Sequence, residues 1–299
     1  MKKGGNPDCN IRMIQHRTFA SMHSVLDMIF PEMSDGKADA LLKKIRAEAD
    51  FLENILSAYH HSGETFILNE KAEHNWMPVS ERLWDILTEC RHFHQLSKGY
   101  FDIGSGWNKK GIRAVSESSI TGIRLLESDE GQRRIRFSGP EIALDFGGIG
   151  KGLLLREIDK ILTQYDVQNC FISFGGSSIL TRGHHPHGDY WPVGYRSHLE
   201  INPVFHMRDE FASFSQGSPD GINATACILN PYTNTSEVNS RISGAQAGCP
   251  VIAEVASTVL ILALPGEMAS LAASFGVGKA VVLSRNSSNQ PVNEFYYES

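Results

Sequence analysis

Cysteine is scarce in this sequence, and its distribution shows no pairing. The chain has 299 residues and five cysteines, which are Cys9, Cys90, Cys170, Cys227 and Cys249. An odd number, wide spacing and the lack of any CxxC pair differ from the patterns of small disulfide-rich domains and of structural zinc sites. The sequence therefore argues against a disulfide framework or a structural zinc site, and it favours a reducing compartment.

Long apolar runs are missing as well. The richest run, residues 251–264, contains Glu254 and is followed by Pro265, whereas a membrane-spanning helix needs about 20 apolar residues. The first residues include two lysines but no apolar stretch of the kind that a secretory signal carries. We expect no membrane span and, for the chain as given, a cytoplasmic protein. A periplasmic protein or a lipoprotein is the alternative if a leader has been removed.

The charge balance is close to even and excludes a broadly basic surface. Lysine and arginine total 28, aspartate and glutamate total 34, and the net charge is −6. A mildly acidic chain does not attract nucleic acid over its whole surface, so an anionic ligand needs a local site. We expect no nucleic-acid partner. Apolar residues make up 41% and charged residues 21%, which is typical of a folded protein with a substantial core.

Apolar spacing predicts helices and strands without a regular alternation. Helices are expected over residues 37–59, 80–96, 153–165 and 251–264, with Ser80 as the N-cap of the second. A hairpin is expected over residues 120–137 with its turn at 128–131, and buried strands over 142–146 and 170–174. Because the elements are interleaved irregularly and no linker divides the chain, the sequence predicts a single α+β domain.

A cluster of glycines stands between a predicted strand and a predicted helix, over residues 147–152. Glycine lets backbone N–H groups approach an anion at a helix N-terminus, and Lys151 adds a full positive charge. The cluster is neither a Walker A loop nor a dinucleotide fingerprint, because Gly152 follows Lys151 and Leu153 stands where the last glycine should be. An anion site and a plain tight turn both remain open at this point.

Two further segments contain candidate metal ligands. Glu254 and Thr258 are four residues apart on the last predicted helix, so they share a face. A carboxylate and a hydroxyl suit Mg²⁺, and a solvent-facing polar stripe is the alternative. The segment 184–189 holds three histidines, but Pro186 and Gly188 interrupt it, which favours an exposed loop.

Five short motifs, taken in order, resemble those of the ApbE family, the FAD:protein FMN transferases. They are LSAY at 56–59 with Ser62 and Leu68-Asn69, SKGYFD at 97–102, LDFGGIGKG at 144–152, FGG at 174–176 and AEVAST at 253–258. Met22 stands where the family has an early Met-Gly-Thr, and Ala212–Ser215 is the nearest match to its Thr-Ser-Gly segment. We therefore expect an N-terminal extension over residues 1–17 and a single ApbE-like FAD-binding domain over 18–299.

The resemblance implies a fold, a reaction and a set of site residues. The fold is a T-fold-related α+β structure of mixed sheets packed with helices. The reaction is a Mg²⁺-dependent transfer of FMN from FAD to a threonine of a flavin-acceptor protein, with release of AMP. The implied catalytic residues are Lys151, Glu254 and Thr258, and the implied magnesium ligands are Gly150, through its carbonyl, Glu254 and Thr258. The implied FAD-binding residues are Met22, Tyr59, Asp102, Gly148, Lys151, Gly175 and Gly176.

The sequence differs from the family pattern at several of these motifs. Glu254 replaces the family's metal-binding aspartate, Gly150 replaces an alanine, and Ser177 replaces an aspartate after the two glycines. Residues 226–234, ACILNPYTN, lack both histidines of the family's HHI[LI]DPxTG. These differences leave two alternatives to the transferase: an FAD-binding relative without transferase activity, and an FAD pyrophosphatase.

Overall fold

The computed structural model describes residues 14–73, 75–104, 122–139, 142–196, 201–217, 228–233, 235–236, 241–285 and 291–299. Its centre is an eight-stranded sheet in which every neighbouring pair of strands is antiparallel. In spatial order the strands are β1 (Ile14–Ser21), β2 (Ser24–Pro31), β6 (Cys170–Phe174), β7 (Ser178–Arg182), β10 (Phe211–Gln216), β13 (Ile242–Ala247), β14 (Lys279–Arg285) and β15 (Pro291–Glu298).

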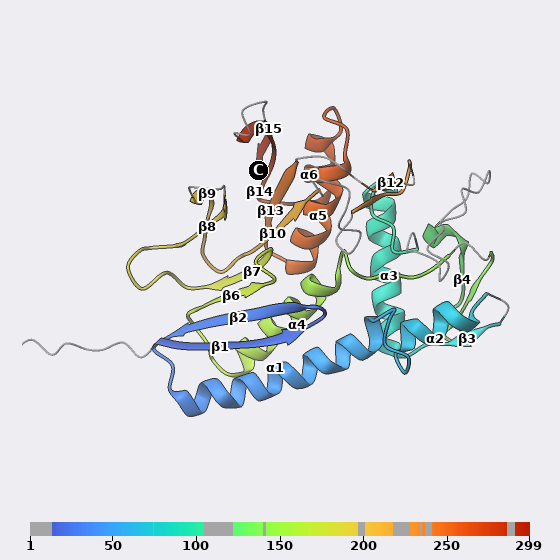
Figure 1. The fold of residues 1–299 in the computed structure, drawn as a ribbon, viewed down its shortest axis with the longest axis horizontal. Helices are drawn as coiled ribbons and strands as arrows, with labels where there is room; N and C mark the ends of the chain where they lie inside the picture. The colour runs from blue at the N-terminus through green and yellow to red at the C-terminus, as the bar shows by residue number, and fades with distance from the viewer. Residues whose placement is uncertain are drawn as a thin grey trace, which may run out of the picture.

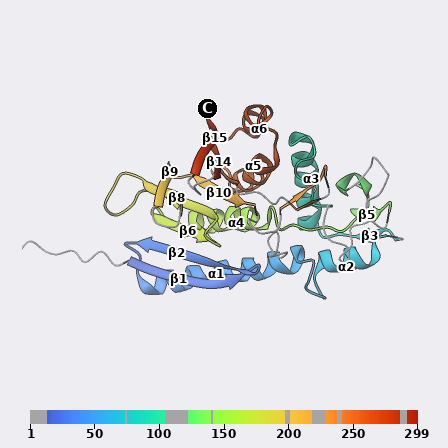
Figure 2. The same ribbon diagram turned by 45° about the horizontal axis from the view of Figure 1, so that its top comes forward.

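Helices and smaller sheets surround this sheet. The helices are α1 (Asp35–Leu56), α2 (Glu64–Lys71), α3 (Glu81–Leu96), α4 (Gly150–Gln164), α5 (Pro250–Leu262) and α6 (Met268–Phe275). The remaining strands are β3 (Met77–Pro78), β4 (Leu126–Asp129) and β5 (Arg134–Phe137) in one sheet, β8 (Trp191–Arg196) with β9 (Ile201–Met207), and β11 (Leu229–Asn230) with β12 (Thr235–Ser236). The three-stranded sheet and the β8–β9 hairpin lie at opposite ends of the molecule (Figures 1 and 2).

The two faces of the large sheet have different partners. Alternate strand residues such as Leu180 and Ala245 belong to the main core, which they share with α1, α4 and α5. The intervening residues, such as Ile179 and Ala212, form a second core with Trp191 and other residues of the β8–β9 hairpin. This period-two alternation decides which side chains of a strand face the helices. The prediction of an α+β fold is confirmed.

Several predicted elements are confirmed with small shifts. The predicted helices over 37–59, 80–96 and 251–264 are α1, α3 and α5, and the predicted strand 170–174 is β6. Ser80 caps α3, because its hydroxyl accepts the N–H of Leu83 at 3.2 Å. The predicted helix over 153–165 starts earlier, at Gly150, so the end of the glycine cluster forms the first turn of α4.

Two predictions were wrong in detail. The turn of the hairpin is at 130–133, because Asp129 pairs with Arg134, and residues 122–125 form a 3-10 helix rather than a strand. Residues 142–146 form no strand element, although they are largely buried. The side chain of Asn69 bonds both the N–H and the carbonyl of Leu144, at 2.8 and 3.0 Å, and thereby supplies the partners that a neighbouring strand would provide.

The predicted boundary of the N-terminal extension is not tested. β1 already begins at Ile14, inside the predicted extension 1–17, and the residues before it lie outside the described part of the chain. Within the described ranges no helix is long and apolar enough to cross a membrane.

Helices α4 and α5 approach each other closely at Gly152. A Cβ atom at this position would lie 2.9 Å from the Cβ of Glu254 and 2.9 Å from the carbonyl oxygen of Pro250. No side chain larger than hydrogen fits there unless the helices separate. The glycine therefore decides how near the start of α4 lies to the face of α5 that carries Glu254.

We predict that Gly152→Ala destabilises the protein by about 1–3 kcal/mol, the usual cost of overpacking a tight core. Urea denaturation followed by circular dichroism measures this. Gly36→Ala is the matched control, because a Cβ at Gly36 in α1 would have nothing within 4 Å, and we expect it to be neutral or slightly stabilising. Equal effects of the two substitutions would contradict the close helix contact.

A tyrosine ties the end of α3 to the start of α6. The Tyr100 hydroxyl donates to Glu267 at 2.7 Å, and the Lys98 ammonium lies 3.3 Å from the same carboxylate. The hydrogen bond from Tyr100, followed by that from Lys98, lowers the pKa of Glu267 below its ordinary 4.5. Burial, followed by the Glu267 bond, raises the pKa of Tyr100 to about 12.

These shifts predict how the stability of the protein depends on pH. A carboxyl group with a lowered folded-state pKa stabilises the fold above pH 4.5 and loses that contribution as the pH falls through its folded-state pKa. Tyr100 contributes below pH 10 and loses its contribution as the pH rises through about 12. The unfolding free energy of Tyr100→Phe should therefore lie furthest below that of the wild type between these pH limits. The difference between the two proteins should become smaller at lower and at higher pH. Parallel curves of unfolding free energy against pH would contradict the prediction.

Candidate functional site

The start of α4 forms the centre of the candidate site. The preceding residue, Ile149, is apolar and has no side-chain group to cap the helix. The backbone N–H of Gly150 bonds the carbonyl of Phe146 at 2.8 Å, which turns the glycine loop into the helix. A helix start with an apolar N-cap and a lysine as its second residue favours an anion, because the helix dipole and the ammonium act together.

Lys151 forms an ion pair with Glu254 of α5, 103 residues further along the chain. The Glu254 side chain is 4% exposed and that of Lys151 23%. The second carboxylate oxygen, Oε2, accepts hydrogen bonds from the hydroxyls of Ser178 at 2.5 Å and Ser213 at 2.8 Å. One cation and two hydroxyls thus compensate a carboxylate that would be costly to bury alone.

Thr258 lies one helical turn beyond Glu254 and belongs to a row of hydroxyl groups. Its Oγ1 donates to the main-chain carbonyl of Glu254 at 3.2 Å and lies 3.4 Å from the hydroxyl of Ser215. Ser215 in turn lies 2.9 Å from the hydroxyl of Ser257. The prediction that Glu254 and Thr258 share a helix face holds, but the carboxylate is buried and paired instead of facing solvent.

Two turns of the large sheet lie side by side, and one of them contacts the start of α4. In the β1–β2 turn, the sulfur of Met22 lies 3.6 Å from the position of a Cβ at Gly150. In the β6–β7 turn, Gly175 has φ +63°, and a Cβ there would lie 2.4 Å from the hydroxyl of Ser24. Gly176 follows with φ +68°, so both residues adopt a backbone conformation that favours glycine.

Gly148 connects the glycine loop to its other neighbours. A Cβ at this position would lie 3.6 Å from the ring of Phe101 and 3.9 Å from the methyl group of Thr258. Met22, Gly148, Gly150, Lys151, Glu254 and Thr258 therefore gather around the start of α4, with the Gly175–Gly176 turn beside the Met22 turn.

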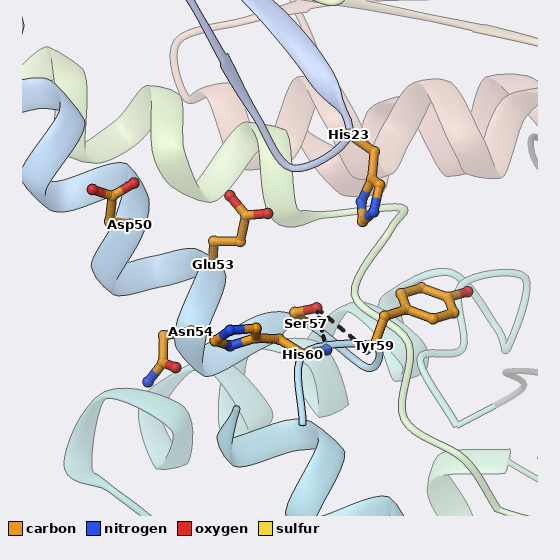
Figure 3. A pocket seen from close by; sticks show the side chains of 7 residues that line it. All are labelled: His23, Asp50, Glu53, Asn54, Ser57, Tyr59 and His60. Atoms are coloured by element: carbon orange, nitrogen blue, oxygen red, sulfur yellow. Dashed lines mark hydrogen bonds between the residues drawn. The ribbon is translucent and has the colours of Figure 1, made fainter. Parts of the chain in front are cut away.

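A hollow of 390 Å³ opens beside the Met22 turn (Figure 3). Its lining residues are His23, Asp50, Glu53, Asn54, Ser57, Tyr59 and His60. The carboxylate of Glu53 accepts the N–H of Met22 at 3.0 Å and the hydroxyl of Ser21 at 3.1 Å, which fixes the turn above the hollow. Ser57 stabilises the loop on the other side of the hollow, because the Ser57 hydroxyl accepts the N–H groups of Tyr59 and His60.

Two aromatic rings mark the edge of this hollow. The side chain of His23 extends from the β1–β2 turn toward Tyr59. The ring centroids of the two residues are 6.0 Å apart in an edge-to-face arrangement. Tyr59 is 72% exposed, so its ring is free to contact a ligand. The negative charge of Asp145, followed by partial burial, raises the pKa of the Tyr59 hydroxyl above 10.0.

The side chain of Asp102 accepts hydrogen bonds from two backbone N–H groups in this region. Its Oδ1 accepts the N–H of Gly104 at 2.8 Å and of Ile123 at 2.9 Å, and its side chain is 4% exposed. The segment runs beside the glycine loop, since the N–H of Asp145 bonds the carbonyl of Ile103 at 2.8 Å. The predicted role of Asp102 in lining an FAD cleft stays a prediction.

Sequence reasoning named the segment Ala212–Ser215 but did not predict that Ser213 and Ser178 bond the carboxylate of Glu254. Ser213 and Ser215 are two residues apart on β10, so both face the helices, and this alternation opposite a buried carboxylate is a usable signal. Ser178 carries no such signal, because it lies alone at the start of β7.

Other sequence candidates are less informative. Ala226, Cys227 and Asn234 lie outside the described residues, while Asn230 accepts the N–H of Tyr232 in a local turn. The loop 184–189 connects β7 to β8 at the surface, as expected. Among the residues that the structure describes, no group of three or more histidine, cysteine, aspartate or glutamate side chains is arranged to hold a metal ion.

Comparison with known proteins identifies one family. Residues 18–281 match the ApbE family. The FAD:protein FMN transferase of Klebsiella pneumoniae (strain 342) is 22% identical over 246 residues, which are 77% of this chain and 68% of the relative. That of Chlamydia trachomatis serovar D is 27% identical over 211 residues, 64% of this chain and 65% of the relative. The chain thus spans about two thirds of the length of these curated relatives.

Solved structures show the same fold at low sequence identity. The apo flavinyl transferase ApbE of Pseudomonas stutzeri has a TM-score of 0.79 and 18% identity, with 96% of each chain covered. The flavin transferase ApbE of Vibrio cholerae has a TM-score of 0.77 and 17% identity, with 96% of this chain and 97% of that chain covered. Since the family match extends over most of the chain and the fold agrees with it, this protein belongs to the ApbE family.

Proposed function

We propose that this enzyme transfers FMN from FAD to a threonine side chain of an acceptor protein and releases AMP. The observation that carries the proposal is the position of the β1–β2 turn. Met22 of this turn lies against Gly150 at the lysine-bearing start of α4, and His23 lines the hollow on its other side. A cationic helix start and a ring-sized hollow therefore adjoin, as binding of a flavin dinucleotide requires.

The start of α4 suits the pyrophosphate of FAD. Phosphoryl transfer depends mainly on positioning and on neutralising the charge of the phosphate oxygens. Lys151 supplies an ammonium group, and the helix start adds the positive end of its dipole. At this helix start the chain therefore supplies groups that bind and orient the pyrophosphate.

The hollow suits a ring system better than a phosphate. Asp50 and Glu53 line it, and their carboxylates repel anions. The exposed ring of Tyr59, with His23 beside it, offers aromatic surface to a planar ligand. We assign the hollow and its Tyr59 edge to a ring of the dinucleotide.

Magnesium is part of the proposal. The carboxylate of Glu254, the hydroxyl of Thr258 and the carbonyl of Gly150 are hard oxygen donors of the kind that Mg²⁺ prefers, and the first two share one face of α5. When bound, the ion would neutralise charge on the pyrophosphate. Magnesium usually takes only one or two protein carboxylates besides phosphate and water, so a single glutamate is compatible with it.

The proposed reaction leads to a test of the products. Incubated with FAD, Mg²⁺ and the acceptor protein of the related Vibrio cholerae transferase, the enzyme should release AMP and add the mass of FMN to the acceptor. Chromatography and mass spectrometry measure the two products. Lys151→Met should slow AMP release about 100-fold, because a preorganised charge near the phosphates is lost.

Lys160→Met is the control, because Lys160 pairs with Glu157 further along the same helix, and its AMP release should stay at the wild-type rate. Release of AMP without an acceptor would support the FAD pyrophosphatase instead. Recovery of intact FAD, with an unmodified acceptor, would contradict the transferase and support a protein that binds FAD without turnover.

The assignment of the hollow is tested by the affinity for FAD. Tyr59→Ala should weaken FAD binding by about 1 kcal/mol, on the order of fivefold in Kd, because an aromatic contact is lost. Tyr59→Phe, which keeps the ring, should bind as the wild type does. Tyr296→Ala on β15 removes another exposed tyrosine and is the matched control. Fluorescence titration with FAD gives the Kd values, and equal values for Tyr59→Ala and Tyr296→Ala would exclude the ring contact.

A further inference from the structure

We propose that Lys151 neutralises Glu254 when no metal is bound, and that a divalent cation has to compete with Lys151 for the Glu254 carboxylate. Binding of the cation frees the Lys151 ammonium for the pyrophosphate. The inference rests on the proposed function only in that Glu254 is the metal-binding carboxylate. It goes beyond that function because it makes the lysine an internal inhibitor of metal binding.

The first step is the orientation of the carboxylate. Ser178 and Ser213 both donate to Oε2 of Glu254, at 2.5 and 2.8 Å, and both serines are at most 2% exposed. Two hydrogen bonds from two different strands restrain rotation of the carboxylate group. Oε1 is therefore the oxygen that Glu254 presents to a cation, and Ser178 and Ser213 are positioning residues for it.

The second step is the occupation of that oxygen. The Lys151 ammonium bonds Oε1 of Glu254. Lys151 is the more exposed partner, at 23% against 4%, and its flexible four-carbon side chain is the part of the pair that is able to move away. A divalent ion and the ammonium cannot both hold this atom at full strength, so they compete.

The third step is the need of a divalent cation for a carboxylate charge. In the part of the chain that the structure describes, no group of three or more histidine, cysteine, aspartate or glutamate side chains is arranged to hold a metal ion. The Thr258 hydroxyl and a main-chain carbonyl are neutral ligands and do not replace a carboxylate charge. A divalent cation at this site therefore depends on Glu254 and has to take the place of Lys151.

The fourth step is the position of the freed ammonium. Lys151 is the second residue of α4, at the helix start whose N-cap is the apolar Ile149. An ammonium released from Glu254 therefore stays beside the same anion-favouring helix end. An anionic ligand that attracts Lys151 would likewise leave Glu254 open for the cation, and this coupling must act equally in both directions.

The chain length of Glu254 is part of this arrangement. Its carboxylate reaches Lys151, Ser178 and Ser213 at once, and these residues come from α4, β7 and β10. A side chain that is one methylene shorter would retract from at least one of these partners. Glu254→Asp therefore weakens the ion pair without removing the charge.

The test measures metal binding in the absence of FAD, with Mn²⁺ as the probe and the electron paramagnetic resonance signal of free Mn²⁺ as the readout. Lys151→Met should bind Mn²⁺ more tightly than the wild type, on the order of tenfold, as expected for removing one competing charge-assisted hydrogen bond. Glu254→Asp should also bind more tightly, and Glu254→Gln should abolish binding. Lys160→Met controls for the loss of one positive charge from α4 and should leave the affinity unchanged.

A second measurement uses the wild-type protein and does not depend on the folding of a variant. Acylation of lysine amines, quantified by mass spectrometry, should increase several-fold at Lys151 when Mn²⁺ is added, because the paired ammonium becomes accessible. Labelling of Lys160 should not change. An affinity in Lys151→Met that is equal to or below that of the wild type, or Lys151 labelling that stays constant while Mn²⁺ binds, would overturn the proposal. Neither measurement contains FAD or an acceptor, so a failure of flavin transfer leaves a separate result.

Discussion

The buried carboxylate of Glu254 is the interaction on which the candidate site depends. It joins helix α4 through Lys151, strand β7 through Ser178 and strand β10 through Ser213, while its own backbone belongs to α5. A charge at this depth is tolerated only with a cation and hydrogen-bond donors around it. The need to compensate one charge therefore holds four elements in register at the point where the site forms.

Close packing makes this interaction possible. Gly152 lets the start of α4 approach α5 to within contact of the Glu254 Cβ, and the next residue toward the N-terminus is Lys151. The β1–β2 turn packs against the same helix start, with Met22 beside Gly150, and the β6–β7 turn packs against the β1–β2 turn, with Gly175 beside Ser24. The hollow at His23 and Tyr59 continues from this turn. In this arrangement the lysine-bearing start of α4 and the hollow adjoin because one turn borders both.

Local patterns identified much of the fold. The apolar stripes of α1, α3 and α5 and the cap at Ser80 are properties of short segments, and the sequence located them within a few residues. The segment 142–146 has the composition of a buried strand, yet at its centre the side chain of Asn69, 75 residues away in sequence, bonds the N–H and the carbonyl of Leu144. A side chain that replaces a neighbouring strand leaves no periodic trace, so the pattern alone could not exclude the strand.

The sequence by itself determined that a lysine stands at a glycine-rich helix start, that Glu254 and Thr258 share a helix face, and that the order of the motifs is that of the ApbE family. Only the tertiary structure decided that Lys151 contacts Glu254, and that two serines occupy the other oxygen of the carboxylate. Helical spacing fixes the relation between residues four apart, because the backbone geometry is regular over that distance. The relation between residues that are 41, 76 and 103 positions apart depends on how distant segments pack around a buried charge.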